Sequence, residues 1–202
     1  MNKKVKIGII HYGCGNIYNV AKSLYKIGLK DVTIVKNGSL KHFDVLILPG
    51  VGSFKNAMLH IKKNDYIEQI TDHIKSGKKL LGICLGMQLL MQSSEELQET
   101  KGLSILKGNV LNLKNFIKNK PLPHVGLNNI SLDNKKFSQL YFDHSYVVIL
   151  KNVNNNFNIG HTLYDGHKFL SYLKIDNITA VQFHPELSGK KGLKFLYDFF
   201  IN

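Results

Sequence analysis

One cysteine of this 202-residue chain lies between two glycines, in the segment GICLG (residues 82–86), just where an apolar run becomes amphipathic. This is the pattern of a strained strand-to-helix turn that exposes a nucleophile. A side chain at either glycine would collide with a neighbouring element, and the start of a helix favours a thiolate at Cys84. The pattern predicts a nucleophilic thiol, although a buried cysteine with glycines kept for packing fits these five residues equally well.

A nucleophilic cysteine needs a base, and the base needs an orienting group. The segment VQFHPE (residues 181–186) brings His184 to the end of an apolar run, and Pro185 stops the strand so that Glu186 can turn back to the imidazole. Open α/β sheets bind ligands at the carboxyl ends of their strands, so Cys84 and His184 are expected at one sheet edge. Alone, His184 fits a structural histidine better, but beside the cysteine it predicts a Cys-His-Glu triad.

A third stretch, LPGVGS (residues 48–53), also lies between a strand and a helix. Acyl transfer needs N–H donors for a developing oxyanion, and a glycine-rich backbone can supply them. We expect one donor from the N–H of Leu85, directly after the cysteine, and another from the loop residues Gly50, Val51 and Gly52. As an isolated feature this loop fits a simple turn.

The segment GCGN (residues 13–16) follows the first strand and hints at a dinucleotide-binding fingerprint. Its third glycine is missing, because position 18 is tyrosine, and no acidic residue ends the second strand. We therefore expect a tight turn here and no nucleotide cofactor.

Short β-branched runs alternate with amphipathic stretches in the first half of the chain. The runs VKIGII, VTIV, VLILPG and LLGIC predict buried parallel strands. Helices are expected over residues 17–27, over 54–74 and from 85 onward. This alternation indicates βαβ units, and hence an α/β fold with an open, flavodoxin-like parallel sheet and helices on both faces.

From about residue 102 the pattern changes to strand-like runs separated by Asn, Asp and Gly, including the hairpin-favouring pair Asp165-Gly166. These predict antiparallel strands laid on or beside the sheet. The chain then returns to an apolar strand, ITAVQF, and ends in an amphipathic helix, GLKFLYDFFI. No linker or repeat divides it, so we expect one domain over residues 1–202.

Composition narrows the class of protein. The net charge of +13 suggests nucleic-acid binding, but all 27 basic residues are scattered lysines and arginine is absent, which disfavours it. Two cysteines are too few for a disulfide framework and indicate a reducing compartment. The nine histidines have no metal-site spacing, so no metal is expected. No apolar run is long enough to span a membrane, and the N-terminus lacks a signal-peptide cleavage site, so we expect a cytoplasmic protein.

Taken together, GICLGMQLL, LPGVGSF and FHPE resemble the class I (triad) glutamine amidotransferases. The segments HYGCGNIYNVAKSL, LPHVGLNN, FDHSY and GKKGLKFL narrow the resemblance to the branch that serves histidine biosynthesis, and the match runs over nearly the whole chain. The resemblance implies that Cys84 attacks the side-chain amide of glutamine, that His184 moves the proton and that Glu186 holds the imidazole. It also implies a set of residues that hold the substrate: Gln88, Glu96, His144, Ser145 and Tyr146.

In that branch, ammonia passes through an internal channel to a separate, barrel-shaped cyclase subunit, so the resemblance implies a heterodimer whose partner activates the glutaminase. The first-strand loop, with Tyr12 and Asn16, would face this partner. One peptide rotation in the loop of residues 50–52 could present or withdraw an oxyanion donor.

The sequence departs from this branch at three positions. His11 replaces a common aspartate, Leu127 a usual tryptophan and Leu187 a usual lysine. All three lie, by analogy, on the face toward the cyclase, so they put the partner in doubt. Two alternatives follow: a paralogue that supplies ammonia to another synthase, such as one that amidates a surface sugar, and a catalytically silent binding subunit, which the complete triad disfavours.

Overall fold

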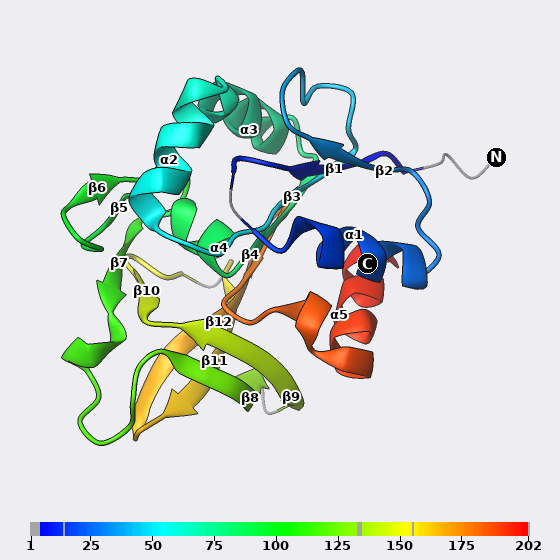
Figure 1. Ribbon diagram of the computed structural model, residues 1–202. Coiled ribbons are helices and arrows are strands. Elements are labelled where there is room, and N and C mark those ends of the chain that lie inside the picture. The colour runs from blue at the N-terminus through cyan, green and yellow to red at the C-terminus, as the bar shows by residue number, and fades with distance from the viewer. Residues whose placement is uncertain (1–4, 14, 133–134, 155, 202) are drawn as a thin grey trace.

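The computed structural model describes residues 5–13, 15–132, 135–154 and 156–201, with the backbone alone for residues 135–138 (Figure 1). Cys14, in the expected GCGN turn, lies outside the described residues. The helices are α1 (Ile17–Lys26), α2 (Phe54–Lys63), α3 (Tyr66–Lys75), α4 (Leu85–Leu89) and α5 (Gly189–Ile201), with short 3-10 turns at Leu113–Asn115 and Pro185–Leu187. The strands are β1 (Ile7–Ile10), β2 (Val32–Val35), β3 (Val45–Leu48), β4 (Lys79–Ile83), β5 (Ser93–Ser94), β6 (Thr100–Lys101), β7 (Gly108–Asn112), β8 (His124–Leu132), β9 (Lys135–His144), β10 (Tyr146–Leu150), β11 (Asn158–Tyr164), β12 (His167–Ile175) and β13 (Ile178–Val181).

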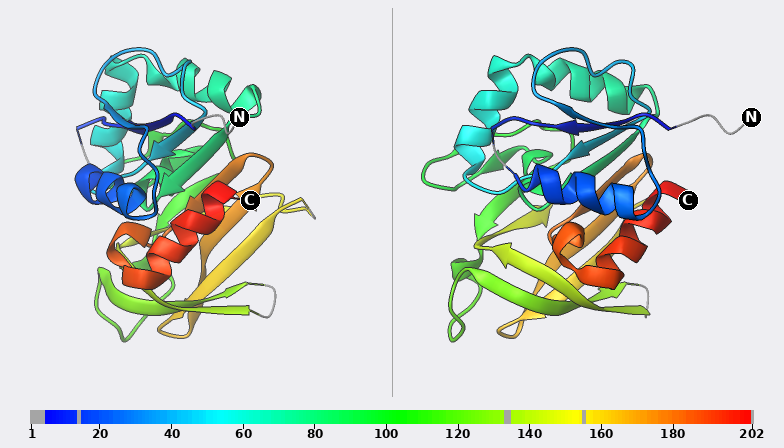
Figure 2. Two further views of the ribbon diagram at one scale, coloured as in Figure 1. Left: turned by 90° about the vertical axis from the view of Figure 1, so that its right-hand side faces the viewer. Right: turned by 45° about the vertical axis from the view of Figure 1, so that its right-hand side comes forward.

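The five parallel strands lie in the order β2-β1-β3-β4-β13, which is the flavodoxin-like order, and so confirm the predicted fold class. Side chains alternate between the two faces: Val45 and Ile47 join one apolar cluster, while Leu46 and Leu48 join the other. The first face is covered by α1 and α5, and the second by α2, α3 and α4 (Figure 2). This two-sided burial explains why the parallel strands are almost wholly apolar.

The second half of the chain supplies the predicted antiparallel strands, in two groups. One group continues the main sheet past β13 in the order β12-β11-β8-β9, and the other forms a small sheet in the order β10-β7-β5-β6. The Asp165-Gly166 pair joins β11 to β12 with φ values of 51° and 76°, the left-handed geometry of a tight hairpin turn. The antiparallel part is therefore mostly an extension of the main sheet.

Two expected elements have different limits in the structure. The helix expected over residues 54–74 is two helices, because Asp65 adopts left-handed backbone geometry with φ 55° and stops the first one. The strand expected for ITAVQF ends at Val181, and His184 instead forms an isolated bridge with Tyr141 of β9. Among the described residues, no helix is both long and apolar enough to cross a membrane.

Candidate active site

Cys84 lies at the turn between β4 and α4, in the interior of the molecule. Its φ of 52° and ψ of −108° are strained for a residue with a side chain. The strain is held by backbone bonds, since the Cys84 N–H donates to the carbonyl of Val181 at 2.7 Å and the Cys84 carbonyl accepts from the N–H of Met87 at 3.0 Å. The sequence pattern of a sharp strand-to-helix turn therefore corresponds to the backbone geometry observed.

The two glycines around Cys84 are required by close backbone packing. A Cβ on Gly82 would lie 3.0 Å from the carbonyl oxygen of Gly86. A Cβ on Gly86 would overlap the carbonyl oxygen of Leu48 in β3. Because both obstacles are backbone atoms, neither can move aside as a side chain would.

His184 and Glu186 form a buried ion pair in which His184 Nδ1 lies 2.8 Å from Glu186 Oε1. Among the described residues, His184 Nε2 has no hydrogen-bond partner, so this atom is left for the thiol and for the reacting proton. Burial lowers the pKa of His184, but its charge and hydrogen-bond interactions with Cys84 and with Glu186 outweigh burial and raise the pKa to about 11. The imidazole of His184 is therefore charged at pH 7.

The backbone around His184 is fixed by Ser188 and β9. The N–H of His184 donates to the carbonyl of Tyr141 at 2.8 Å. The hydroxyl of Ser188 donates to the His184 carbonyl at 2.6 Å and accepts from the Tyr141 N–H at 2.9 Å. These bonds hold the imidazole against the end of the parallel sheet.

A cavity of about 250 Å³, here called the cysteine cavity, opens beside Cys84 at the carboxyl ends of the parallel strands. It brings together most of the expected site residues and two that were not expected, Pro123 and Asp143. The full lining is Val51, Gly52, Cys84, Leu85, Gln88, Glu96, Pro123, Asp143, His144, Ser145 and Tyr146. Its place at the loops that follow β3 and β4 is where α/β sheets commonly bind ligands.

The loop of residues 49–52 is supported from beneath by Tyr12. The Tyr12 side chain is fully buried and its hydroxyl donates to the carbonyl of Pro49. A Cβ on Gly50 would overlap this hydroxyl. Contrary to the expectation, the side chain of Tyr12 therefore lies in the interior and not on a surface that a partner could contact, because it fills the space under the glycine-rich loop.

Two of the expected substrate-holding side chains also have structural bonds. Glu96 Oε2 accepts from the N–H of Phe54 at 2.6 Å, at the first residue of α2. Gln88 Nε2 donates to the carbonyl of Tyr146 at 3.1 Å and to Gln182 Oε1 at 3.1 Å. The cavity wall is thus fixed before any substrate binds.

Two histidines in edge-to-face contact lie at the site, and one of them, His144, lines the cysteine cavity. His124 Nδ1 lies 3.1 Å from His144 Nε2, and His144 Nδ1 lies 3.0 Å from the carbonyl oxygen of Tyr146. Burial, and then the charge of His124, lower the pKa of His144 to about 3. Burial, and then Lys120, lower the pKa of His124 to about 4. Both imidazoles are therefore neutral at pH 7 and serve as hydrogen-bonding groups.

The residues that depart from the family pattern have distinct surroundings. Leu127 is 62% exposed and Leu187 is 40% exposed, so both are accessible to a partner in the isolated chain. His11 is half-buried and its Nδ1 accepts from the N–H of Gly13 at 3.0 Å. An imidazole nitrogen here accepts a turn N–H as a carboxylate would. Asn16 is also half-buried, and its Oδ1 accepts from Asn19 Nδ2.

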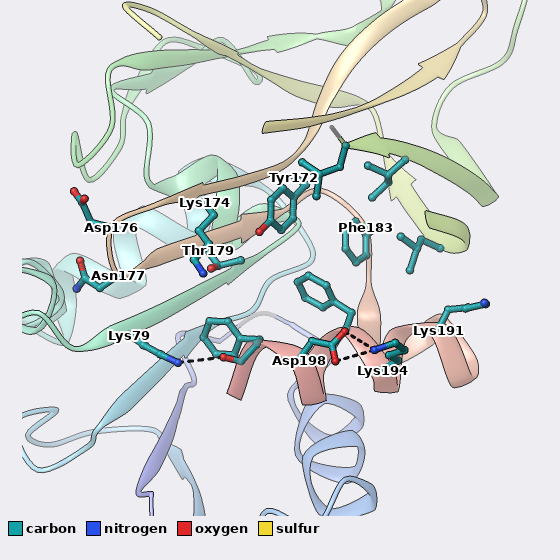
Figure 3. A pocket seen from close by; sticks show the side chains of 15 residues that line it. Lys79, Tyr172, Lys174, Asp176, Asn177, Thr179, Phe183, Lys191, Lys194 and Asp198 are labelled. Carbon is teal, nitrogen blue, oxygen red and sulfur yellow. Dashed lines mark hydrogen bonds and ion pairs between the residues drawn. The ribbon is translucent and has the colours of Figure 1, made fainter. Parts of the chain in front are cut away.

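A second and larger cavity, of about 470 Å³, lies between α5 and the sheet and is here called the lysine cavity. Tyr172 projects into it from β12 and Phe183 from the segment just after β13, and α5 opposite carries Lys194 and Asp198 (Figure 3). Its other charged lining residues are Lys79, Lys174, Asp176 and Lys191, and it contains no histidine or cysteine among the described residues. The described lining of the larger cavity therefore lacks a cysteine–histidine pair.

Three buried polar residues of the site were missed by the sequence analysis: Gln182, Ser188 and His124. Gln182 has a visible signal, because it is a polar residue between the apolar Val181 and Phe183, whereas Ser188 and His124 lie in no such run. Gln182 is fully buried and its Nε2 lies 3.5 Å from Cys84 Sγ.

Known proteins are similar to this chain over almost its whole length. The family described as "Glutamine amidotransferase class-I" matches residues 9–202. A protein of Caldanaerobacter subterraneus subsp. tengcongensis named "Imidazole glycerol phosphate synthase subunit HisH" is 42% identical over 96% of this chain and 96% of its own length. A protein of the same name from Methanocaldococcus jannaschii is 40% identical over 96% of this chain and 97% of its own.

Solved structures share the fold at much lower identity. The chain described as "Structure of PurLQS from Thermotoga maritima" has a TM-score of 0.74 at 16% identity, covering 98% of this chain and 99% of that one. Another, described as "Crystal structure of glutamine amidotransferase", has a TM-score of 0.71 at 14% identity, covering 95% and 96%.

Proposed function

We propose, from the premise that this chain belongs to the glutamine amidotransferase class-I family, that it is the glutaminase subunit of an imidazole glycerol phosphate synthase. The observation that carries the proposal is the strained thiol of Cys84 at the same sheet edge as the buried His184–Glu186 pair, beside a cavity sized for a small molecule. The subunit hydrolyses glutamine to glutamate and ammonia and passes the ammonia to a cyclase subunit.

The reaction begins when Cys84 Sγ attacks the side-chain carbonyl carbon of glutamine. The carbonyl oxygen becomes an oxyanion, which the N–H of Leu85 and an N–H of the 50–52 loop stabilise. His184 then gives its Nε2 proton to the amide nitrogen, the C–N bond breaks and ammonia leaves, so that a glutamyl thioester is formed on Cys84.

Hydrolysis of the thioester uses the same groups in reverse order. Neutral His184 removes a proton from water, and the hydroxide attacks the thioester carbon. The C–S bond breaks, glutamate leaves and the thiolate is restored beside the imidazolium. Glu186 holds the Nδ1–H and stabilises the charged ring in both steps.

The substrate is held by the walls of the cysteine cavity, in our proposal by Gln88, Glu96 and the His144-Ser145-Tyr146 segment. The exposed Leu127 and Leu187, with the first-strand loop near Asn16, form the surface that docks the cyclase. Cyclase binding moves the loop of residues 50–52 so that an N–H points at the oxyanion. The reactions need no resident cofactor, and we place the complex in the cytoplasm.

One observation keeps a second candidate open. Leucine at 127 and at 187 gives an apolar, exposed contact surface without the family's aromatic and lysine. The alternative is a paralogue with the same glutaminase chemistry that supplies ammonia to another synthase, such as one that amidates a surface sugar.

The test mixes the wild-type chain with a histidine-pathway cyclase and measures glutamate release. We expect much faster glutamine hydrolysis than by the chain alone, and a loss of more than about a thousandfold in Cys84→Ala, whose circular dichroism spectrum is unchanged. An unchanged rate of glutamate release in Cys84→Ala would disprove the proposal that this chain is a glutaminase with Cys84 as its nucleophile. Failure of the cyclase to bind or stimulate the wild type, with no rescue of a histidine auxotroph, would favour the paralogue.

A further inference from the structure

The side-chain amide of Gln182 lies beside the sulfur of Cys84, and the sheet register explains why. Strands β13 and β4 pair in parallel with Val181 opposite Ile83, so the next residues, Gln182 and Cys84, are also neighbours. Gln182 Nε2 lies 3.5 Å from Cys84 Sγ, and both side chains are buried. An amide at this position is in contact with the atom that would form the thioester.

The orientation of that amide is fixed by a chain of bonds that starts at a backbone carbonyl. A carbonyl oxygen can only accept a hydrogen bond. The side-chain atom of Gln88 that lies 3.1 Å from the carbonyl oxygen of Tyr146 must therefore be the amide nitrogen, Nε2, and not the amide oxygen. The same nitrogen lies 3.1 Å from the Gln182 amide, which must therefore present its Oε1 there. The N–H of Gln182 is left to point at Cys84 Sγ.

A donor that faces sulfur stabilises the thiolate more than the thiol, because a thiolate is the better acceptor. The helix that follows Cys84 has only five residues, Leu85–Leu89, so its dipole is weak. Cys84 Sγ also lies 3.9 Å from the carbonyl oxygen of Asp143, which favours the protonated thiol. Within the part of the chain that the structure describes, the side chain that donates a hydrogen bond to the sulfur is thus Gln182.

We propose that Gln182 is a catalytic residue that donates a hydrogen bond to the Cys84 thiolate, and that Gln88 is a positioning residue that keeps the Gln182 amide in its donating orientation. Both amide protons of Gln88 are taken by Tyr146 and Gln182, so its Oε1 is the atom available to a substrate. Gln88 therefore links the binding of glutamine to the state of the nucleophile. The role in turnover rests on the proposed glutaminase function, but the role in thiolate stabilisation does not.

The experiment measures the rate at which iodoacetamide alkylates Cys84 as a function of pH, followed on the peptide that contains Cys84 so that Cys14 does not interfere. In Gln182→Met, which keeps the volume but has no donor, we expect alkylation at pH 7 to slow by about tenfold and the half-maximal rate to shift about one pH unit upward. This readout needs neither glutamine nor a cyclase.

Gln182→Glu separates a donor from a space-filling role. An ionised carboxylate accepts from Gln88 and turns a second oxygen toward the sulfur, so alkylation at pH 8 is expected to be slower than in Gln182→Met. At acid pH the carboxyl is protonated and donates again, so its rate relative to wild type is expected to rise as pH falls. A purely structural role would lower the rate equally at every pH.

Gln92→Met is the matched control, because the Gln92 side chain is exposed and the change is chemically the same. Its Cys84 should be alkylated at the wild-type rate.

In the glutaminase assay with cyclase, Gln182→Met should lower kcat about tenfold with a smaller change in KM. Alkylation profiles within twofold of wild type in both Gln182 variants would overturn the proposal. If Gln182→Met does not fold, the profile of Gln182→Glu decides. Loss of glutaminase activity in the wild type itself would count against the proposed function only.

Discussion

The cysteine cavity and the lysine cavity differ in what holds their walls. The smaller one, about 250 Å³, is surrounded by buried polar groups with fixed partners and by one residue in strained backbone geometry. The larger one, about 470 Å³, is lined by aromatic and aliphatic side chains and by lysines, of which Lys194 is paired with Asp198. An active site is recognised by polar groups that are buried and held in fixed orientations, and the volume of a cavity alone does not identify one.

The largest loss of stability is expected from a substitution at the Cys84 turn. In Gly86→Ala, the new Cβ overlaps the Leu48 carbonyl of β3, so we expect the free energy of unfolding to fall by about 4 kcal/mol. Gly77→Ala is the control, since Gly77 has open space around it and only its φ of 77° opposes a side chain, which costs about 1 kcal/mol. Urea unfolding measures both, and similar losses in the two variants would contradict the packing argument.

The next largest effect is on activity. Glu186→Gln keeps the shape of the pair but removes the charge that helps to raise the pKa of His184. We expect glutaminase kcat with cyclase to fall about a hundredfold, equivalent to about 2.7 kcal/mol, with little change in melting temperature. Activity within threefold of wild type would mean that the ion pair does not orient the base.

The third prediction is that His144, which lines the cysteine cavity, makes the protein less stable at acid pH. Burial, followed by the charge of His124, holds the pKa of His144 near 3, whereas an unfolded histidine has a pKa of about 6.5. The unfolded state therefore binds more protons below pH 6.5, and stability falls as pH falls. His144 alone should cost about 2 kcal/mol at pH 5 relative to pH 7.

The measurement is the urea midpoint at pH 7 and at pH 5, in wild type and in His144→Asn. His184 partly opposes this loss, because its raised pKa keeps it protonated in the folded state while an unfolded histidine loses its proton between pH 5 and pH 7, but this contribution is present in both proteins and cancels from the comparison. The variant should lose less stability between pH 7 and pH 5 than wild type does. An equal loss in both proteins would show that His144 is protonated without cost in the folded state.

The smallest effect is expected at the lysine cavity. Phe199 is half-buried on α5, and its backbone carbonyl accepts from Lys79 Nζ at 3.3 Å. Phe199→Ala should lower the free energy of unfolding by about 1.5 kcal/mol, less than for a fully buried phenylalanine, and leave glutaminase kcat unchanged. A fall in kcat of more than threefold would show that the two cavities are coupled.

What the sequence could predict depended on how local each feature is. The Cys84 turn and the Asp165-Gly166 hairpin were visible because adjacent residues determine those backbone angles. The parallel pairing of the first strands followed from the alternation of strands and helices. The pairing of the antiparallel strands into two sheets was not visible, since it depends on contacts between strands far apart in the chain.

The same reasoning explains the misses at the site. The family resemblance implied that Tyr12 faces the partner, but packing under Pro49 buries its side chain. Gln182 lies against Cys84 only because β13 pairs with β4 in one register, over a separation of 98 residues. His124 and His144 meet across the β8–β9 pair, in which they are opposite each other.

The central claim is that glutamine is cleaved through a covalent bond to Cys84. The most direct measurement is acid quenching of the chain during turnover of glutamine with the cyclase, followed by mass spectrometry of the peptide that contains Cys84. We predict a mass increase of one glutamyl group, glutamine less ammonia, on Cys84, and none in Cys84→Ala. Continued release of glutamate by Cys84→Ala, or a glutamyl adduct on another residue, would contradict the account.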